Sequence, residues 1–227
     1  MSRWYCIPPA NFLFLLENWN THMIIAPHVL HNETYREFYK THPNLYTMLD
    51  NGLWEGEVLS NANLLKMAND LHVNEIVAPD DITAIKTIRK TKSFLRYLDK
   101  KDQRFKFKIH GAIHGETFAQ QNNCFETFME CDIDVVDLPK MLGPDQREEW
   151  IYDINERAPD IDIHCLGYYP CELDLLESND GFIRSFDTSV PFKLRYKAKF
   201  NLDLPNNWFN RNLIKWRLRS WKSKYYE

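Results

Sequence analysis

The sequence predicts an α/β protein built as a (β/α)8 barrel, compact or incomplete, with a basic C-terminal extension. Short apolar runs alternate with longer amphipathic runs, the pattern of strands that alternate with helices. The apolar runs end in polar residues near positions 50, 80, 114, 138, 167 and 187, between 20 and 34 residues apart. That spacing fits one strand, one helix and a right-handed crossover per unit. An open doubly wound sheet is the alternative architecture.

The strands are predicted from short apolar runs that end in polar or glycine-containing turns. Residues 23–26 could open the series, and an eighth strand could lie in residues 192–200, so closure of the barrel is inferred rather than counted. The stretch from His28 to Tyr39 is ambiguous. The six clearest predicted strands are residues 45–49, 75–78, 105–109, 135–136, 161–166 and 182–186.

The helices are predicted from apolar residues that recur with helical spacing. The first covers residues 59–71, where Ser60 is a candidate N-cap. The next covers residues 82–99, with Asp81 as its candidate cap and its basic residues facing water. Further helices are predicted around residues 118–129 and 150–154, with a short one from Pro170 to Leu176.

The formal charge of −4 conceals an asymmetry between the body and the C-terminus. Residues 192–227 carry ten Lys and Arg against Asp203 and Glu227, a net charge of +8, which leaves −12 for the rest. We therefore divide the chain into a barrel domain, 1–191, and a basic aromatic segment, 192–227, packed on it. Cations and aromatic rings together are typical of nucleic-acid contacts, although a docked helix with basic residues facing outward explains the same pattern. The predicted nucleic-acid-binding residues are Lys215, Arg217, Arg219, Lys222 and Lys224.

Other features bear on location and cofactors. The five cysteines are odd in number and form no CxxC pair, which favours a reduced intracellular protein. No apolar run long enough to span a membrane and no signal-peptide pattern is found, so we expect a cytoplasmic location. No HExxH, P-loop or GxGxxG motif occurs, and we predict no metal and no cofactor.

Carboxylates at the predicted strand ends are the remaining candidates for chemistry. A barrel of this kind builds its active site where the strands end, and Asp50, Asp80, Asp137 and Asp187 all lie there. One carboxylate can attack a sugar carbon while a second transfers a proton. Such chemistry requires two carboxylates in one pocket with different protonation states.

Four motifs in this order resemble the tRNA-guanine transglycosylase superfamily, and most of all its short phage and bacterial branch, the DNA 7-deazaguanine transglycosylases. The resemblance covers roughly residues 45–191. The motifs are Leu49-Asp50-Asn51-Gly52, residues 76–81 (IVAPDD), residues 109–115 (IHGAIHG) and residues 186–189 (FDTS).

The resemblance implies a barrel enzyme that replaces guanine in DNA, or in tRNA, by a 7-deazaguanine base such as preQ0. Asp187 would form a covalent bond to the sugar, Asp50 would act as general acid and base, and Asp80 would bind the base. His114 stands where the family often has glutamine, and the cysteine-rich zinc site of the tRNA enzymes is missing. The further residues implied to bind substrate are Gly115, Asn51 and Gly52.

Two other functions and several structural roles fit the same residues. The chain could be an N-glycosidase acting on small nucleosides, or a nucleic-acid-binding barrel without activity. Asn51-Gly52 is a strong turn signal in its own right. Asp80 and Asp187 could cap following segments, Asp137 could form a solvated pair with Lys140, and His110 and His114 could be core histidines.

Overall fold

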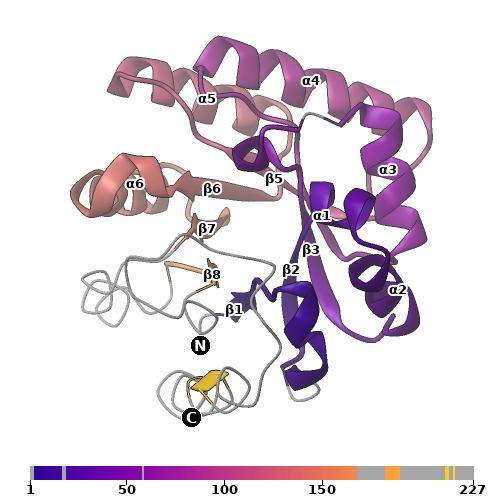
Figure 1. The fold of residues 1–227 in the computed structure, drawn as a ribbon. Coiled ribbons are helices and arrows are strands. Elements are labelled where there is room, and N and C mark those ends of the chain that lie inside the picture. Colours follow the sequence, from indigo (N-terminus) through magenta and orange to yellow (C-terminus); the bar gives the residue numbers. More distant parts are fainter. Residues whose placement is uncertain are drawn as a thin grey trace.

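The computed structural model describes residues 3–16, 19–57, 59–167, 182–189, 213–214 and 217. Eight parallel strands follow one another in chain order and close into a barrel, and the helices lie outside it (Figure 1). The predicted (β/α)8 barrel is therefore confirmed. Closure excludes the open doubly wound sheet.

Closure depends on a strand that the sequence analysis missed. Strand β1 pairs with β2 on one side and with β8 on the other, which places Tyr5 opposite Asp187. The predicted strand at residues 192–200 lies outside the described residues and is not needed for closure. The strands are β1 Arg3–Cys6, β2 Thr21–Ile25, β3 Tyr46–Asp50, β4 Glu75–Val77, β5 Lys108–Ala112, β6 Val135–Pro139, β7 Asp162–Leu166 and β8 Ser185–Thr188.

The helices agree with the amphipathic patterns, apart from their ends. Ser60 caps α3, because its side chain accepts a hydrogen bond from the Asn63 N–H. The prediction of Asp81 as the cap of α4 is wrong: Thr83 occupies that position, and Asp81 pairs with Lys90 instead. The helices are α1 Ala26–His31, α2 Glu33–Thr41, α3 Asn61–Asp70, α4 Ala84–Lys100, α5 Phe118–Glu130 and α6 Gly143–Arg157, with short 3-10 turns η1 Ala10–Leu15, η2 Leu53–Glu55 and η3 Lys140–Leu142.

Two strand predictions were displaced along the chain. Strand β5 begins at Lys108 rather than at Phe105, whose side chain is 97% exposed. His110 therefore lies within a strand and not in a turn. Strand β8 begins at Ser185, so Asp187 is an internal strand residue and not the residue that follows the strand. The expected short helix over 170–176 lies outside the described residues.

Alternation along the strands separates two buried regions. The outward-facing side chains, such as Ile76, Ile109 and Phe186, join the main apolar core between sheet and helices. A smaller apolar cluster that includes Tyr5 and Met48 is separate from it. Fully buried ionisable side chains also occur, which apolar surroundings tolerate only when those groups are paired.

These ionisable side chains form a column centred on His110. His110 Nε2 lies 2.9 Å from Glu75 Oε2, and His110 Nδ1 lies 2.7 Å from Asp137 Oδ1. Arg184 pairs with Glu75, to which Tyr5 also donates a hydrogen bond of 2.9 Å. Asp137 is fully buried, so the predicted solvated pair with Lys140 is wrong.

Two residues of this column, His110 and Glu75, have pKa values shifted from their usual ranges. Burial alone would lower the pKa of His110, but the Asp137 and Glu75 carboxylates outweigh it and raise that pKa to about 9. Burial alone would raise the pKa of Glu75, but hydrogen bonds and charges from His110 and Arg184 hold it well below the usual range. The centre of the barrel therefore holds a charged imidazolium between two carboxylates.

Little of the basic segment is described. Ile214 is fully buried and belongs to the main core, and the helical residue Arg217 is partly exposed. The nucleic-acid contacts predicted for Lys215, Arg219, Lys222 and Lys224 fall outside the described residues, and the contact predicted for Arg217 stays a prediction. Within the described part of the chain, no helix is long and apolar enough to cross a membrane.

Candidate active site

A pocket of about 430 Å³ opens at the carboxyl ends of the strands. Asp50 at the end of β3, Asp80 after β4, Lys140 after β6 and Asp187 in β8 all line it. Trp54 from η2 also lines it and is 65% exposed. Three of the predicted carboxylates therefore meet in one pocket, whereas Asp137 lies below it in the column. In a barrel of this kind the carboxyl end is where chemistry is expected.

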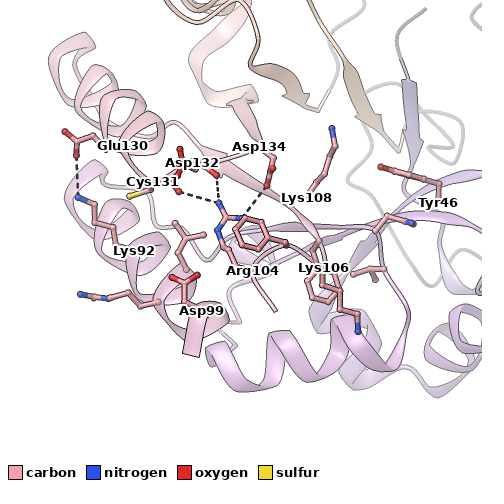
Figure 2. A pocket seen from close by; sticks show the side chains of 16 residues that line it. Tyr46, Lys92, Asp99, Arg104, Lys106, Lys108, Glu130, Cys131, Asp132 and Asp134 are labelled. Atoms are coloured by element: carbon pink, nitrogen blue, oxygen red, sulfur yellow. Dashed lines mark hydrogen bonds and ion pairs between the residues drawn. The ribbon is translucent and has the colours of Figure 1, made fainter. Parts of the chain in front are cut away.

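A larger hollow of about 810 Å³ lies at the opposite end of the barrel, near the start of β3 and β5 (Figure 2). Four of its charged side chains pair with one another: Lys92 contacts Glu130, and Arg104 contacts Asp134 (Figure 2). The Arg104 guanidinium also bonds the Asp132 carbonyl, which joins two neighbouring loops. This hollow is larger, but its polar groups serve the fold, so we place the active site at the carboxyl end.

Asp50 has a raised pKa. Burial raises its pKa well above the usual range, and the nearby Glu55 and Asp80 carboxyls raise it further. Asp50 Oδ2 accepts a hydrogen bond of 3.0 Å from the Gly52 N–H. Gly52 has a φ of +84°, and a Cβ there would lie 2.3 Å from a Pro27 side-chain carbon, so only glycine fits this turn. The raised pKa makes Asp50 the candidate proton donor of the pocket.

Asp80 is fixed by two other predicted residues. Its Oδ1 accepts a hydrogen bond of 3.0 Å from the Asn51 amide, and its Oδ2 lies 2.7 Å from His114 Nε2. Asn51 also donates to the Ala78 carbonyl at 3.0 Å. Asn51 and His114 do not line the pocket themselves; they hold the carboxylate that does. His114 is 1% exposed, as a core histidine would be.

Gly115 has a structural place rather than a ligand-facing one. Its carbonyl accepts a hydrogen bond of 3.0 Å from the Gln121 side chain, and its φ is +143°. A Cβ at this position would lie 2.7 Å from a Gln120 side-chain carbon. Gly115 therefore allows the loop to turn closely into α5.

Asp187 is held through one of its two oxygens. Its Oδ1 accepts a hydrogen bond of 2.7 Å from the Gly167 N–H and lies 3.3 Å from His164 Nε2. The side chain is 5% exposed and lines the pocket. Strand β8 therefore presents a firmly positioned carboxyl to any bound molecule.

Lys140 is a basic pocket residue to which the sequence analysis assigned no role in the site. It follows β6 directly, and its aliphatic stem packs on Gly167, where a Cβ would lie 3.0 Å from the lysine Cδ. The buried Arg147 side chain holds the supporting backbone by donating to the carbonyls of Pro139, at 3.2 Å, and Gly167, at 2.9 Å. The sequence feature that could have identified Lys140 as a site residue was its position directly after a predicted strand end. Within the described residues, no group of three or more His, Cys, Asp or Glu side chains is arranged to hold a metal ion.

Replacing Gly167 by alanine is expected to lower the free energy of unfolding by about 1–2 kcal/mol, since its φ of +70° disfavours other residues. It should also displace the Lys140 stem. Gly56→Ala is a matched control, because Gly56 has a φ of +77° and open space around its Cβ position. Urea denaturation measures the stability, and a loss no larger than that of the control would contradict the packing role.

Comparisons with known proteins establish the fold. No protein-family model and no curated protein matches the chain. Solved structures do match over nearly the whole chain. Orotidine 5'-monophosphate decarboxylase from Sulfolobus solfataricus has a TM-score of 0.58 at 12% identity, covering 96% of this chain and 100% of the other. 3-Keto-L-gulonate-6-phosphate decarboxylase from Vibrio cholerae has a TM-score of 0.55 at 11% identity, covering 99% and 98%.

An aldolase belongs to the same group of structures. It is named as a 4-hydroxy-2-oxoglutarate aldolase, with a TM-score of 0.56 at 11% identity, and the match covers 98% of this chain and 92% of the other. Identities this low establish the barrel architecture alone. The similar structures named here are aldolase and decarboxylase barrels.

The function predicted from the sequence is corrected by these matches. The similar structures named above are an aldolase and decarboxylases and not transglycosylases, and they contradict the exchange of a nucleic-acid base for a 7-deazaguanine. Asp50, Asp80 and Asp187 do converge as that prediction required. Convergence of carboxylates is common to many reactions, which is why the motifs alone misdirected the assignment.

Proposed function

We propose that this chain is an enzyme, a lyase that breaks a carbon–carbon bond next to a carbonyl group in a small substrate. The observation that carries the proposal is the pocket itself, in which one lysine and three aspartates face the same 430 Å³ space. A pocket of this size suits a small metabolite. Aldolase and decarboxylase barrels with the same fold agree with the proposal but do not decide it.

The proposed reaction needs a place for negative charge. When the carbon–carbon bond breaks, its electron pair stays on the carbon next to the carbonyl, and the charge spreads onto the carbonyl oxygen. An ammonium group at Lys140, beside several carboxyls, would stabilise that oxygen. Preorganised charge in a site shielded from water has the largest effect on such a step.

Proton transfer completes the reaction. The raised pKa of Asp50 keeps a proton available, and this proton passes to the carbon that holds the electron pair. If the departing group is a carboxylate, it leaves as carbon dioxide. If it is a carbinol, Asp187 accepts the hydroxyl proton and the group leaves as an aldehyde. Two aspartates in different environments thus supply the acid and the base.

Replacing Lys140 by methionine is expected to lower kcat/KM by about 10²–10³-fold, the usual loss when one charge-stabilising group is removed. The assay uses a panel of β-keto acids and 4-hydroxy-2-oxo acids and detects released carbon dioxide or aldehyde. Lys66→Met is the control, since Lys66 lies on α3, pairs with Asp70 and is absent from the pocket lining. A wild-type protein inactive on the whole panel, or a fully active Lys140→Met variant, would refute the proposal.

A further inference from the structure

Asp187 and two side chains beneath it, His164 and Ser185, form a continuous hydrogen-bonded series. Ser185 Oγ lies 2.8 Å from His164 Nδ1, and His164 Nε2 lies 3.3 Å from Asp187 Oδ1. Ser185 and His164 are fully buried, while Asp187 lines the pocket. Serine, histidine and aspartate are thus connected in the order of a hydrolase triad, but the carboxyl and not the hydroxyl faces the pocket.

Burial decides which end of this hydrogen-bonded series, Ser185 or Asp187, can react. A nucleophilic serine must reach a substrate, and Ser185 has no exposed surface. Ser185 and Asp187 point to the same side of β8, two residues apart, so the serine sits one layer deeper in the barrel. His164, on the neighbouring β7, is in register with Ser185. His164 and Ser185 therefore hold Asp187 in place from the interior of the barrel.

Hydrogen-bond directions follow from the inventory of donors. A carboxylate oxygen can only accept, so His164 must carry its proton on Nε2 to donate to Asp187. In the neutral ring Nδ1 is then an acceptor, and the Ser185 hydroxyl donates to it. The Asp187 carboxylate thus selects the tautomer of the histidine, and the serine, whose hydroxyl can donate or accept, satisfies the other ring nitrogen. The ring is also enclosed by edge contacts to Tyr5 and His110, with centroid distances of 5.8 Å and 5.6 Å.

We propose that His164 is a positioning residue for Asp187, with Ser185 holding the imidazole ring at Nδ1. Together with the Gly167 N–H, His164 occupies Asp187 Oδ1 and leaves Oδ2 as the oxygen that takes a proton from a bound substrate. The part of this inference that concerns catalysis rests on the lyase function proposed above. The hydrogen-bond chain itself does not depend on that function, and it can be measured without a substrate.

The first test is the tautomer of His164, observed by NMR of the full chain with 15N-labelled histidine. We expect the Nε2–H form in the wild-type protein and in Ser185→Ala, and a mixture of both neutral tautomers in Asp187→Ala, which lacks the acceptor at Nε2. His22→Gln assists the assignment, since His22 is a buried histidine bound to the Trp19 carbonyl and the Tyr39 hydroxyl, outside these three residues. An Nδ1–H form in the wild type, or an unchanged tautomer in Asp187→Ala, would overturn the inference.

The second test separates positioning from folding. His164→Gln keeps an amide donor in place of Nε2 and is expected to retain kcat within about threefold, whereas His164→Leu should lose about 10–100-fold in kcat with little change in KM. Equal kcat values for the two variants would overturn the positioning role. If His164→Leu does not fold, Ser185→Ala takes its place with a smaller expected loss. If the wild type has no lyase activity, the proposed function fails while the tautomer experiment still decides the hydrogen-bond chain.

Discussion

Replacing His110 by leucine is expected to lower the free energy of unfolding by about 3–5 kcal/mol, the usual result of removing one partner from a buried ion pair. His110 is fully buried and joins Glu75 to Asp137. Without the imidazolium, Asp137 loses the contact to its Oδ1, while its Oδ2 already has no hydrogen-bond partner among the described residues. Glu75 keeps Arg184 and Tyr5. Urea denaturation at pH 6 measures the change.

A second histidine supplies the control for that prediction. His22 is equally buried, but its neighbours are the Trp19 carbonyl and the Tyr39 hydroxyl. Burial lowers the pKa of His22 to about 4, so it is neutral in the folded protein. His22→Leu should therefore cost only about 1–3 kcal/mol, the penalty for lost neutral hydrogen bonds. Equal losses in the two variants would show that the charge at His110 is unimportant.

A double variant tests whether His110 and Asp137 stabilise the fold as a pair. His110→Leu combined with Asp137→Leu removes both charged partners, and replacing a buried pair by apolar groups is often close to neutral. We expect the double variant to be more stable than His110→Leu alone. A double variant that is less stable, by the sum of two independent losses, would mean that the two residues do not act as a pair.

The sequence predicted the barrel because its information is local and repeated. Each strand-helix unit has its own apolar pattern, so six units were visible without knowledge of their contacts. The first strand, Arg3–Cys6, lacked such a unit around it and was recognised only through its pairing with β2 and β8. Asp50, Asp80 and Asp187 were found because polar residues at strand ends are a topological signal.

The remaining parts of the site depend on contacts between distant residues. Lys140 reaches the pocket because its stem packs on Gly167, and Asn51 and His114 bind Asp80 rather than a ligand. His164 and Ser185 were not predicted, since their positions inside an apolar run resemble core residues. Which of several converging carboxyls bears a proton depends on burial, which a single sequence does not give.

Stability should also fall at alkaline pH by about 3 kcal/mol through His110 alone. The folded protein holds this proton up to a pKa of about 9, whereas an unperturbed histidine releases it near 6.5. The contribution is complete below pH 6.5 and is lost as the pH rises through 9. Glu75 acts at the other end: its lowered pKa stabilises the fold above about pH 4.5, and that contribution is lost as the pH falls. The contributions of these two groups are both complete between about pH 4.5 and 6.5.

The measurement is a series of urea denaturation curves from pH 5 to pH 9.5 for the wild type, His110→Leu and His22→Leu. Buried thiols such as Cys6, whose pKa burial raises, also destabilise the fold above pH 9, so the decisive range is pH 6.5 to 9. In that range the wild type and His22→Leu should each lose about 3 kcal/mol more than His110→Leu. The raised pKa of Asp50 gives all three proteins the same additional loss. An equal loss in His110→Leu would show that another group causes the alkaline transition and that a buried imidazolium at His110 does not stabilise this fold.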